Sequence, residues 1–295
     1  MTKKGPFREH HTKLANKWRQ IKPLISSGSW LSNEPVGPAR SREISHAEPI
    51  EHDSLRILTF NIQAGLNSQA YADYVKSSLK QFLPSPPDMD HIGAIGDLIK
   101  PYDLVALQEL DGGSHRSGHL NQLSYLAKHG AFEFWHQQLN RNLGRFGQFS
   151  NGLLSRFTPF QVEDHKLPGL PGRGAIIARY KLKDASIAVC CVHLALSEKA
   201  RHKQLAYVRD LLIQEKHLVL MGDMNCLGHQ LEATPIGELG LIKPEDHLHS
   251  YPSWEPSKNI DHILVTPSLK VSQMEVIDSQ LSDHRPVAMV VECLS

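Results

Sequence analysis

The most constraining feature of the chain is a long series of short apolar segments that begins at Leu55. Each segment has the length and the alternating or continuous apolar composition of a strand, and turn-forming residues separate it from the next. The segments predicted as strands are LRILTFNI, DLVALQEL, AFEFWHQ, SNGLLS, GAIIARYKL, SIAVCCVHL, HLVLMGDM, IDHILVT, KVSQMEVI and PVAMVVE. Helices are predicted near residues 89–100, 119–129 and 198–215. Many strands with few interposed helices predict layered sheets with helices outside, an α/β sandwich.

The first 50 residues differ from this pattern, so we expect an N-terminal extension over residues 1–50 and a folded domain over residues 51–295. The extension is predicted to be a helix and a linker, because HTKLANKWRQIKPLI places Leu14, Trp18 and Ile21 at helical spacing and Gly, Ser and Pro follow. Two interpretations stay open. The segment is either a short helix or tail of the domain, or a basic amphipathic anchor for a membrane surface or nucleic acid.

The composition bears on partners and location. Lys plus Arg is 32 and Asp plus Glu is 31, so any binding of nucleic acid or acidic lipid must come from a local patch. The four cysteines form no CxxC pair, which favours a reduced, cytoplasmic environment. No apolar run follows Lys3 and Lys4 as in a signal peptide, and none approaches the roughly 18 residues of a membrane span. We therefore expect a cytoplasmic monomer.

Polar residues capable of chemistry recur where predicted strands end, and on α/β scaffolds such positions form binding sites. Asn61 closes the strand ILTFN, although an Asn there is most often a turn former. Glu109 ends the strand LVALQE. Its carboxylate is a hard oxygen ligand that suits Mg²⁺ or Mn²⁺.

The stretch LMGDMN carries the next candidates, Asp223 and Asn225. Two residues apart, their side chains share one face if the chain stays extended. An Asp that orients or deprotonates water beside an Asn that binds an oxyanion would make a hydrolytic site. The alternative is an ordinary Asx turn after a strand.

Histidines paired with acids complete the set. Asp283 and His284 stand together just before the last strand, and Asp261 begins an earlier one. A catalytic His usually needs a carboxylate to fix its tautomer, and Asp261 would supply it if the two strands are neighbours. His193 ends the strand AVCCVH, where a lone His is more often a satisfied core residue.

In this order, LTFNIQ, LVALQEL, NGLLSR, VHLALS, LMGDMN, NIDHILV and SDHRPV resemble the successive motifs of the endonuclease/exonuclease/phosphatase superfamily, from about Leu55 to Glu292. The resemblance implies a four-layer α/β/β/α sandwich of two packed mixed β-sheets flanked by helices, with a catalytic site at one rim.

The resemblance also implies roles. Glu109, Asn61 and Asp283 would bind Mg²⁺, with Mn²⁺ as a substitute. Asp223 would activate water, while the remaining catalytic residues would bind and stabilise the phosphate: Asn225, His193, and His284 supported by Asp261.

The fold does not specify the substrate, so the candidate substrate-binding residues must be sought in the loops. Arg116, Asn151 and Arg173 are the candidate substrate-binding residues, although each arginine is equally an exposed loop charge. The near-neutral charge and the absence of a basic, aromatic stripe favour a phospholipid headgroup or another small phosphorylated substrate over nucleic acid. Two alternatives stay open: a DNA or RNA nuclease of the same superfamily, and a catalytically silent binding module.

Overall fold

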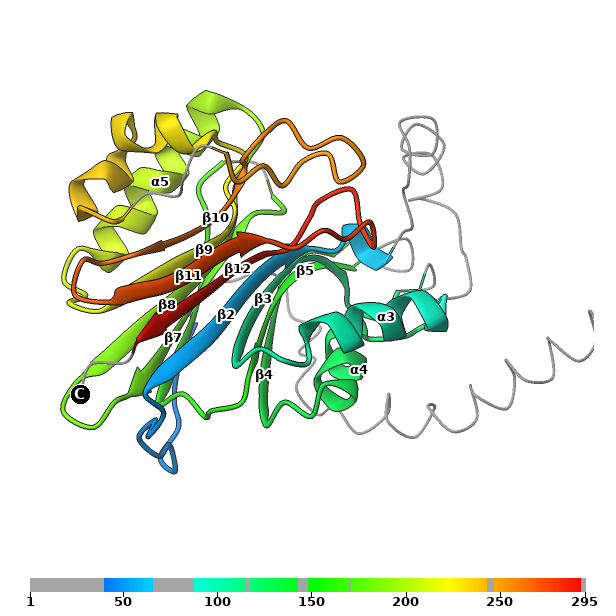
Figure 1. Ribbon diagram of the computed structural model, residues 1–295, viewed down its shortest axis with the longest axis horizontal. Coiled ribbons are helices and arrows are strands. Elements are labelled where there is room, and N and C mark those ends of the chain that lie inside the picture. Colours follow the sequence, from blue (N-terminus) through cyan, green and yellow to red (C-terminus); the bar gives the residue numbers. More distant parts are fainter. Residues whose placement is uncertain are drawn as a thin grey trace, which may run out of the picture.

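Two six-stranded β-sheets form the centre of the molecule (Figure 1). The computed structural model describes residues 40–65, 88–114, 117–142, 148–169, 171–242 and 247–292. The first sheet has the order β1 (Arg40–Glu43), β6 (Gln161–Lys166), β7 (Gly174–Lys181), β8 (Ser186–His193), β9 (Leu218–Asp223), β10 (Asp261–Val265). The second sheet has the order β11 (Lys270–Val276), β12 (Val287–Glu292), β2 (Ser54–Asn61), β3 (Leu104–Asp111), β5 (Gln148–Ser155), β4 (Phe134–Asn142). Both sheets are mixed, because β8 pairs with β9 and β2 with β3 in parallel, among otherwise antiparallel pairs.

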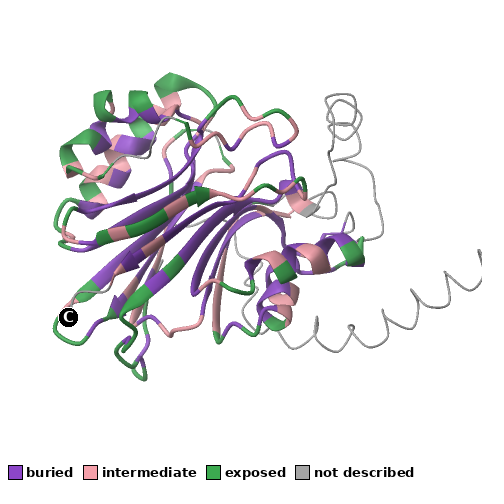
Figure 2. Ribbon diagram, viewed as in Figure 1, coloured by how far each residue is buried: buried purple, intermediate pink, exposed green. Residues whose placement is uncertain are grey.

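The central strands of each sheet are buried on both faces, as their near-continuous apolar sequences require, whereas β11 at an edge is largely exposed (Figure 2). Alternate residues of each strand face opposite sides. In β8, Val189 and Cys191 point into the core between the two sheets, while Cys190 and Val192 point to the outer layer of helices. Neighbouring apolar residues of one strand therefore belong to two different cores, one between the sheets and one between the first sheet and its helices.

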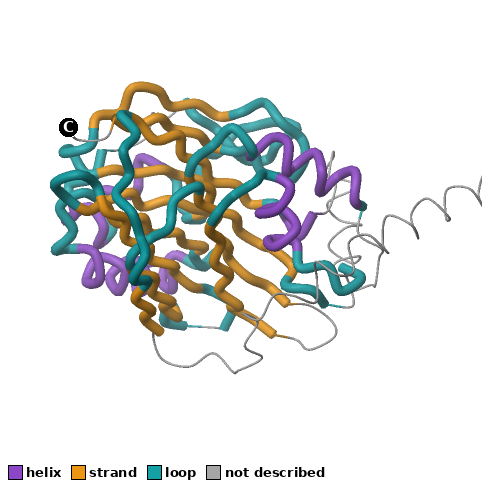
Figure 3. Tube along the Cα trace, turned by 90° about the horizontal axis from the view of Figure 1, so that it is seen from below, coloured by secondary structure: helices purple, strands orange, loops and turns teal. Residues whose placement is uncertain are grey.

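Helices cover the outer face of each sheet (Figure 3). α3 (Met89–Ile99) and α4 (Gln122–His129) pack on the second sheet, and α5 (Glu198–Leu212) packs on the first with the 3-10 helices η3 (Gly228–Ala233) and η4 (Pro235–Leu239). Asp88 and Asn121 cap α3 and α4 by accepting backbone N–H groups of the first turn. The predicted four-layer α/β/β/α sandwich is confirmed.

The three predicted helices are present within a few residues of their expected bounds, and so are the ten predicted strands. β1 and β6 were not predicted, because RSRE and QVEDHK are too polar to read as strands. β1 pairs with β6, and Ile44 and Ile50 join the core between the sheets. Residues 40–50 are therefore packed on the sandwich, although the sequence placed them in the extension.

The predicted N-terminal helix lies outside the described residues, so both of its interpretations, a helix or tail of the domain and a membrane or nucleic-acid anchor, stay untested. Among the helices of the described ranges, none is both long and apolar enough to cross a bilayer.

Candidate active site

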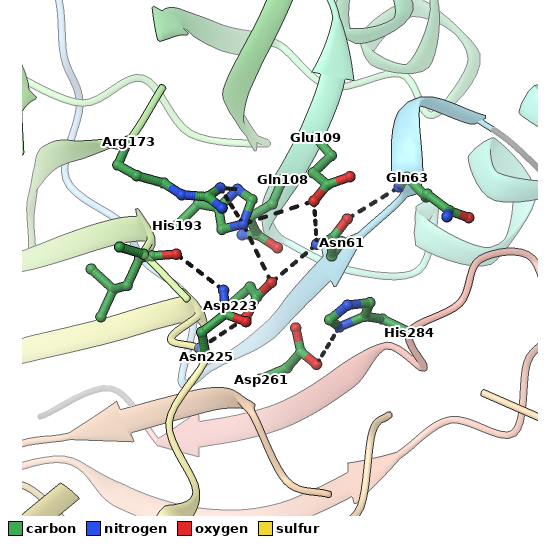
Figure 4. Close-up of polar contacts among 12 residues, drawn as sticks. Asn61, Gln63, Gln108, Glu109, Arg173, His193, Asp223, Asn225, Asp261 and His284 are labelled. Carbon is green, nitrogen blue, oxygen red and sulfur yellow. Dashed lines mark hydrogen bonds and ion pairs between the residues drawn. The ribbon is translucent and has the colours of Figure 1, made fainter. Parts of the chain in front are cut away.

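The ends of strands from both sheets meet at one rim of the sandwich (Figure 4). In the first sheet, His193 of β8 is in register with Asp223 of β9, and Asp223 is in register with Asp261 of β10. The second sheet contributes Asn61 from the end of β2 and Glu109 from β3. The structure thus brings together five of the residues that the sequence singled out.

The turn after β9 holds Asp223 through its neighbours. Gly222 has φ 141°, and a Cβ atom there would lie 1.9 Å from the carbonyl oxygen of Val192, so only glycine fits. Asp223 Oδ1 accepts the backbone N–H of Asn225 at 3.0 Å. This is the Asx turn that the sequence offered as the alternative, and it leaves Oδ2 of Asp223 directed at the site.

Asn61 lies between two carboxylates. Its Nδ2 donates to Asp223 Oδ2 at 3.1 Å and to Glu109 Oε1 at 3.3 Å, and its Oδ1 accepts the backbone N–H of Gln63 at 3.1 Å. This network fixes the orientation of the amide, because only the NH₂ group can donate. Asn61 therefore bridges the two acids as a donor, and its oxygen, the atom a cation would need, is shared with Gln63.

Glu109 owes its direction to an irregularity in β3. The pairing of β3 with β5 shifts register between Leu107 and Leu110, and Glu109 has φ 58°. A bulge of this kind turns a side chain away from the regular alternation, and a non-glycine residue in the left-handed region is uncommon outside functional sites. Glu109 thereby faces the rim, with its side chain 32% exposed.

Asp261 and His284 form a buried pair. Asp261 Oδ2 lies 2.7 Å from Nδ1 of His284 and accepts the Ser250 hydroxyl at 2.6 Å. Burial alone would lower the pKa of His284, but the surrounding carboxylates, Asp261 foremost, hold it well above its usual value. The imidazole is therefore protonated at neutral pH, and its Nε2 is the ring nitrogen that Asp261 leaves for other partners.

Burial also decides the pKa values of Asp223 and His193. Burial, aided by the charge of Asp261, raises the pKa of Asp223 to about 7 against the opposing effect of His284. Burial and the Arg173 guanidinium lower the pKa of His193 well below its usual value, so His193 is neutral. His193 Nε2 lies 3.4 Å from Asp223 Oδ2.

A cleft of about 580 Å³ opens above this arrangement. Its lining includes Glu109, His193, Asp283 and two of the predicted substrate-binding residues, Asn151 and Arg173. Arg173 Nη1 lies 2.8 and 2.6 Å from the two ring nitrogens of His193, of which a neutral imidazole offers one as acceptor. Asn151 donates to the Gly174 carbonyl at 3.1 Å, and its Oδ1 has no partner among the described residues. Arg116, the third predicted residue, lies outside the described residues.

The acidic side chains at the cleft suit a divalent cation. Within the described ranges, Glu109, Asp223 and Asp283 form no ion pair with a Lys or Arg. Burial, together with the charge of Glu109, raises the pKa of Asp283, which is only 6% exposed. The protonated His284 offsets only part of this negative charge, and hard oxygen donors match Mg²⁺ or Mn²⁺. Asp223, Asp261 and His284 form a second group whose ligand atoms lie within 4.8 Å of one another.

Sequence reasoning missed several residues that build the site. Ser250 shares the Asp261 oxygen. Gln122 links the 3-10 helix η1 (Gln63–Gly65), which follows β2, to the last residue of β3: its Nε2 donates to the Ala64 carbonyl and its Oε1 accepts the Asp111 N–H. These contacts depend on tertiary structure, and no local pattern in the sequence marks them. Arg141 and Phe149 line the cleft from β4 and β5.

A family model of the endonuclease/exonuclease/phosphatase family matches residues 58–284. The chain belongs to this family, and the predicted resemblance is confirmed. Its site is that of a phosphoesterase fold: carboxylates, amides and histidines gathered at one rim of the sandwich. A search of curated proteins gives no match.

Solved structures show the same fold. An endonuclease/exonuclease/phosphatase from Beutenbergia cavernae is 20% identical, with 82% of this chain and 72% of that chain covered and a TM-score of 0.61. A mannosyl-6-phosphatase from Bacteroides thetaiotaomicron is 16% identical over 81% of this chain and 100% of its own, with a TM-score of 0.59. A humanised D. rerio TDP2 is 15% identical over 82% and 100%, with a TM-score of 0.57. At these identities the likeness is one of fold.

Proposed function

We propose that the protein is a Mg²⁺-dependent hydrolase of phosphoric esters, with Mn²⁺ as a substitute. One observation carries the proposal: Asp223 lies between a neutral His193 and the protonated His284, beside two acidic side chains that no Lys or Arg of the described residues neutralises. Base, cationic donor and cation ligands are thus gathered at one rim of the sandwich, where Glu109 and Asp283 also line the cleft.

Asp223 is the residue proposed to orient and deprotonate the attacking water. The Asn225 N–H holds one carboxylate oxygen and the Asn61 amide holds the other, so the group is fixed before substrate binds. A pKa near 7 lies in the range where a carboxylate is both ionised and basic enough to accept a proton.

His284 is proposed to donate from Nε2 to the phosphate, where negative charge develops. Asp261 holds the opposite ring nitrogen, which fixes the tautomer and supports the positive charge. Arg173 and His193 line the cleft and would contact other phosphate oxygens.

Glu109 and Asp283 would hold the divalent cation, with the Asn61 oxygen as a further ligand. Its chemistry is the neutralisation of charge on the non-bridging phosphate oxygens, which is worth several kcal/mol in such reactions. Neither carboxylate forms an ion pair with a Lys or Arg of the described residues, so both are available to a cation.

A small phosphorylated compound or a phospholipid headgroup is the substrate class we propose. A cleft of about 580 Å³ has the size of pockets that enclose small molecules. The similar fold of a mannosyl-6-phosphatase agrees with such a substrate.

The test is a substrate panel with Mg²⁺, Mn²⁺ or EDTA: sugar phosphates, phosphoinositides, sphingomyelin, plasmid DNA, abasic duplex and single-stranded RNA. We expect metal-dependent hydrolysis of a small phosphate ester that is absent in Asp223→Ala. Cleavage of a nucleic acid alone would make the protein a nuclease. Cation and phosphate binding without hydrolysis of any compound would favour a silent binding module.

A further inference from the structure

Arg141 is a cation of the cleft that the proposed reaction leaves without a role. It lies at the end of β4, opposite Phe149 of β5, which is in turn opposite Asp111 of β3. β4 is thus two strands away from the strand that carries Glu109. With adjacent strands about 4.8 Å apart, Arg141 lies on the order of 10 Å to the side of the proposed cation ligands.

A bulge directs Arg141 to the cleft. The pairing of β4 with β5 shifts register between Leu139 and Arg141, which leaves Asn140 unmatched. Consecutive residues of a regular strand point to opposite faces, yet Asn140 and Arg141 both line the cleft. The irregularity therefore adds a charged side chain to the cleft wall that a regular strand would turn away.

The Arg141 guanidinium is exposed and forms no hydrogen bond or ion pair with any residue that the structure describes. Its aliphatic part packs along the loop before β7, since a Cβ atom on Gly172 would lie 3.7 Å from Cβ and Cδ of Arg141. Four arginines elsewhere are paired with carboxylates, and Arg156 and Arg201 donate to backbone carbonyls; the four pairs are Arg56 with Asp103, Arg179 with Glu163, Arg209 with Glu238 and Arg285 with Asp278.

The acidic and the basic side chains that line the cleft form no ion pairs with one another among the described residues. Glu109 and Asp283 are the acidic residues of the described lining, and both belong to the proposed cation site. Among the described residues, neither Arg141 nor Arg173 forms an ion pair with a carboxylate, although Glu109 and Asp223 act on Arg173 from a longer distance. Arg173 contacts His193 at the floor, so it would face the phosphate that reacts, and Arg141 would face a different part of the substrate.

The geometry points to Arg141 as the binding site for a second anionic group of the substrate, a phosphate beside the one that is hydrolysed. This inference rests on the proposed function and narrows it to small phosphate esters that carry two phosphates. A guanidinium binds phosphate through two parallel N–H donors, so the second group adds affinity and orientation. A long polynucleotide is less suited, because the described lining offers only these two arginines as cations.

The test compares the binding of glucose 1,6-bisphosphate and glucose 6-phosphate by calorimetry with Mg²⁺. The full chain carries Asp223→Asn in every sample, so that the ligands stay intact. We expect the bisphosphate to bind at least about tenfold more tightly than the monophosphate. Adding Arg141→Gln should remove that advantage without changing the affinity for the monophosphate. Lys183→Ala, which removes an exposed cation two residues beyond the C-terminal end of β7 and outside the cleft lining, is the control and should change neither affinity.

Equal affinities for the two sugars, or an advantage that persists in Arg141→Gln, would overturn the inference, and so would no binding of the bisphosphate. Vesicles with phosphatidylinositol 4-phosphate, compared with phosphatidylinositol, show whether the second phosphate comes from a lipid headgroup. Oligothymidylate that outcompetes the bisphosphate through Arg141 would assign the site to nucleic acid and contradict the small-substrate inference. These assays measure binding, so they are independent of whether the wild-type chain hydrolyses any ester.

Discussion

Nδ1 of His284 lies 2.7 Å from Oδ2 of Asp261, although the two residues come from opposite sheets of the sandwich. Asp261 begins β10 of the first sheet, and His284 precedes β12 of the second. The pair therefore joins the sheets at the rim, and its geometry depends on how they pack. Ser250 and Ser253 secure it, because their segment hydrogen-bonds to Asp261 and to the backbone of Asp283 and Arg285.

Asp261→Asn is expected to lower the rate by roughly 10²- to 10⁴-fold, since the imidazolium of His284 loses its supporting charge. Asp261 raises the pKa of His284, so the variant should lose the protonated histidine at lower pH than the wild type does. The alkaline limb of the pH-rate profile should move to lower pH. Asp278→Asn, an exposed acid that pairs with Arg285, is the control. An unchanged profile in Asp261→Asn would contradict the role of the pair.

Gln122→Met is expected to weaken Mg²⁺ binding roughly 10- to 100-fold, because Gln122 ties η1, just after Asn61, to Asp111 at the end of the strand that carries Glu109. Gln204 offers a matched control: it is also buried and bridges two loops, Ala195 and Pro168, on the other sheet. Calorimetry should show normal Mg²⁺ affinity in Gln204→Met. If the two variants lose affinity equally, the effect is a general loss of stability.

Binding of Mg²⁺ is expected to release protons at and below neutral pH. Burial raises the pKa of Asp223 to about 7, so this carboxyl is partly protonated there, and burial also raises the pKa of Asp283. A nearby cation favours the charged forms, and the apparent affinity should therefore rise with pH until both are ionised. Calorimetry in buffers of different ionisation enthalpy measures the release. A heat that is the same in all buffers near pH 7 would contradict it.

Gly222→Ala is expected to destabilise the fold by more than about 3 kcal/mol, because the new Cβ atom would overlap the Val192 carbonyl. Gly169 provides the comparison: its φ is also positive, at 113°, but nothing lies within 4 Å of an added Cβ. Gly169→Ala should cost only about 1 kcal/mol, from backbone strain alone. Denaturant unfolding of both variants measures the difference, and similar losses would show that contact with Val192 is not the cause.

The sequence was sufficient where local pattern decides structure. Strands such as LVALQE are apolar on both faces, and those at the centre of each sheet were predicted close to their observed bounds. β1 is an edge strand and β6 is the strand next to it, and both have polar sequences, so they take their strand conformation from pairing with their neighbours. β4 was predicted to begin at Ala131, but φ of 55° there delays the strand to Phe134.

The candidate site was predictable in its residues and less so in their contacts. Asp223 and Glu109 stand at strand ends, a position that sequence shows directly. The pairing of Asp261 with His284 was expected between neighbouring strands, whereas it forms across the two sheets. The bulge that brings Arg141 to the cleft is a matter of register between β4 and β5, which a single sequence does not encode in any short motif.

The most direct test of the central claim is the hydrolysis of bis(p-nitrophenyl) phosphate by the purified chain, with Mg²⁺ and with EDTA, beside Asp223→Asn as the blank. This activated diester needs no match to the cleft, so it reports on the proposed catalytic groups alone. The account predicts turnover that requires the cation and falls at least about 10²-fold in Asp223→Asn. Turnover that survives EDTA, or that is equal in the variant, would contradict it.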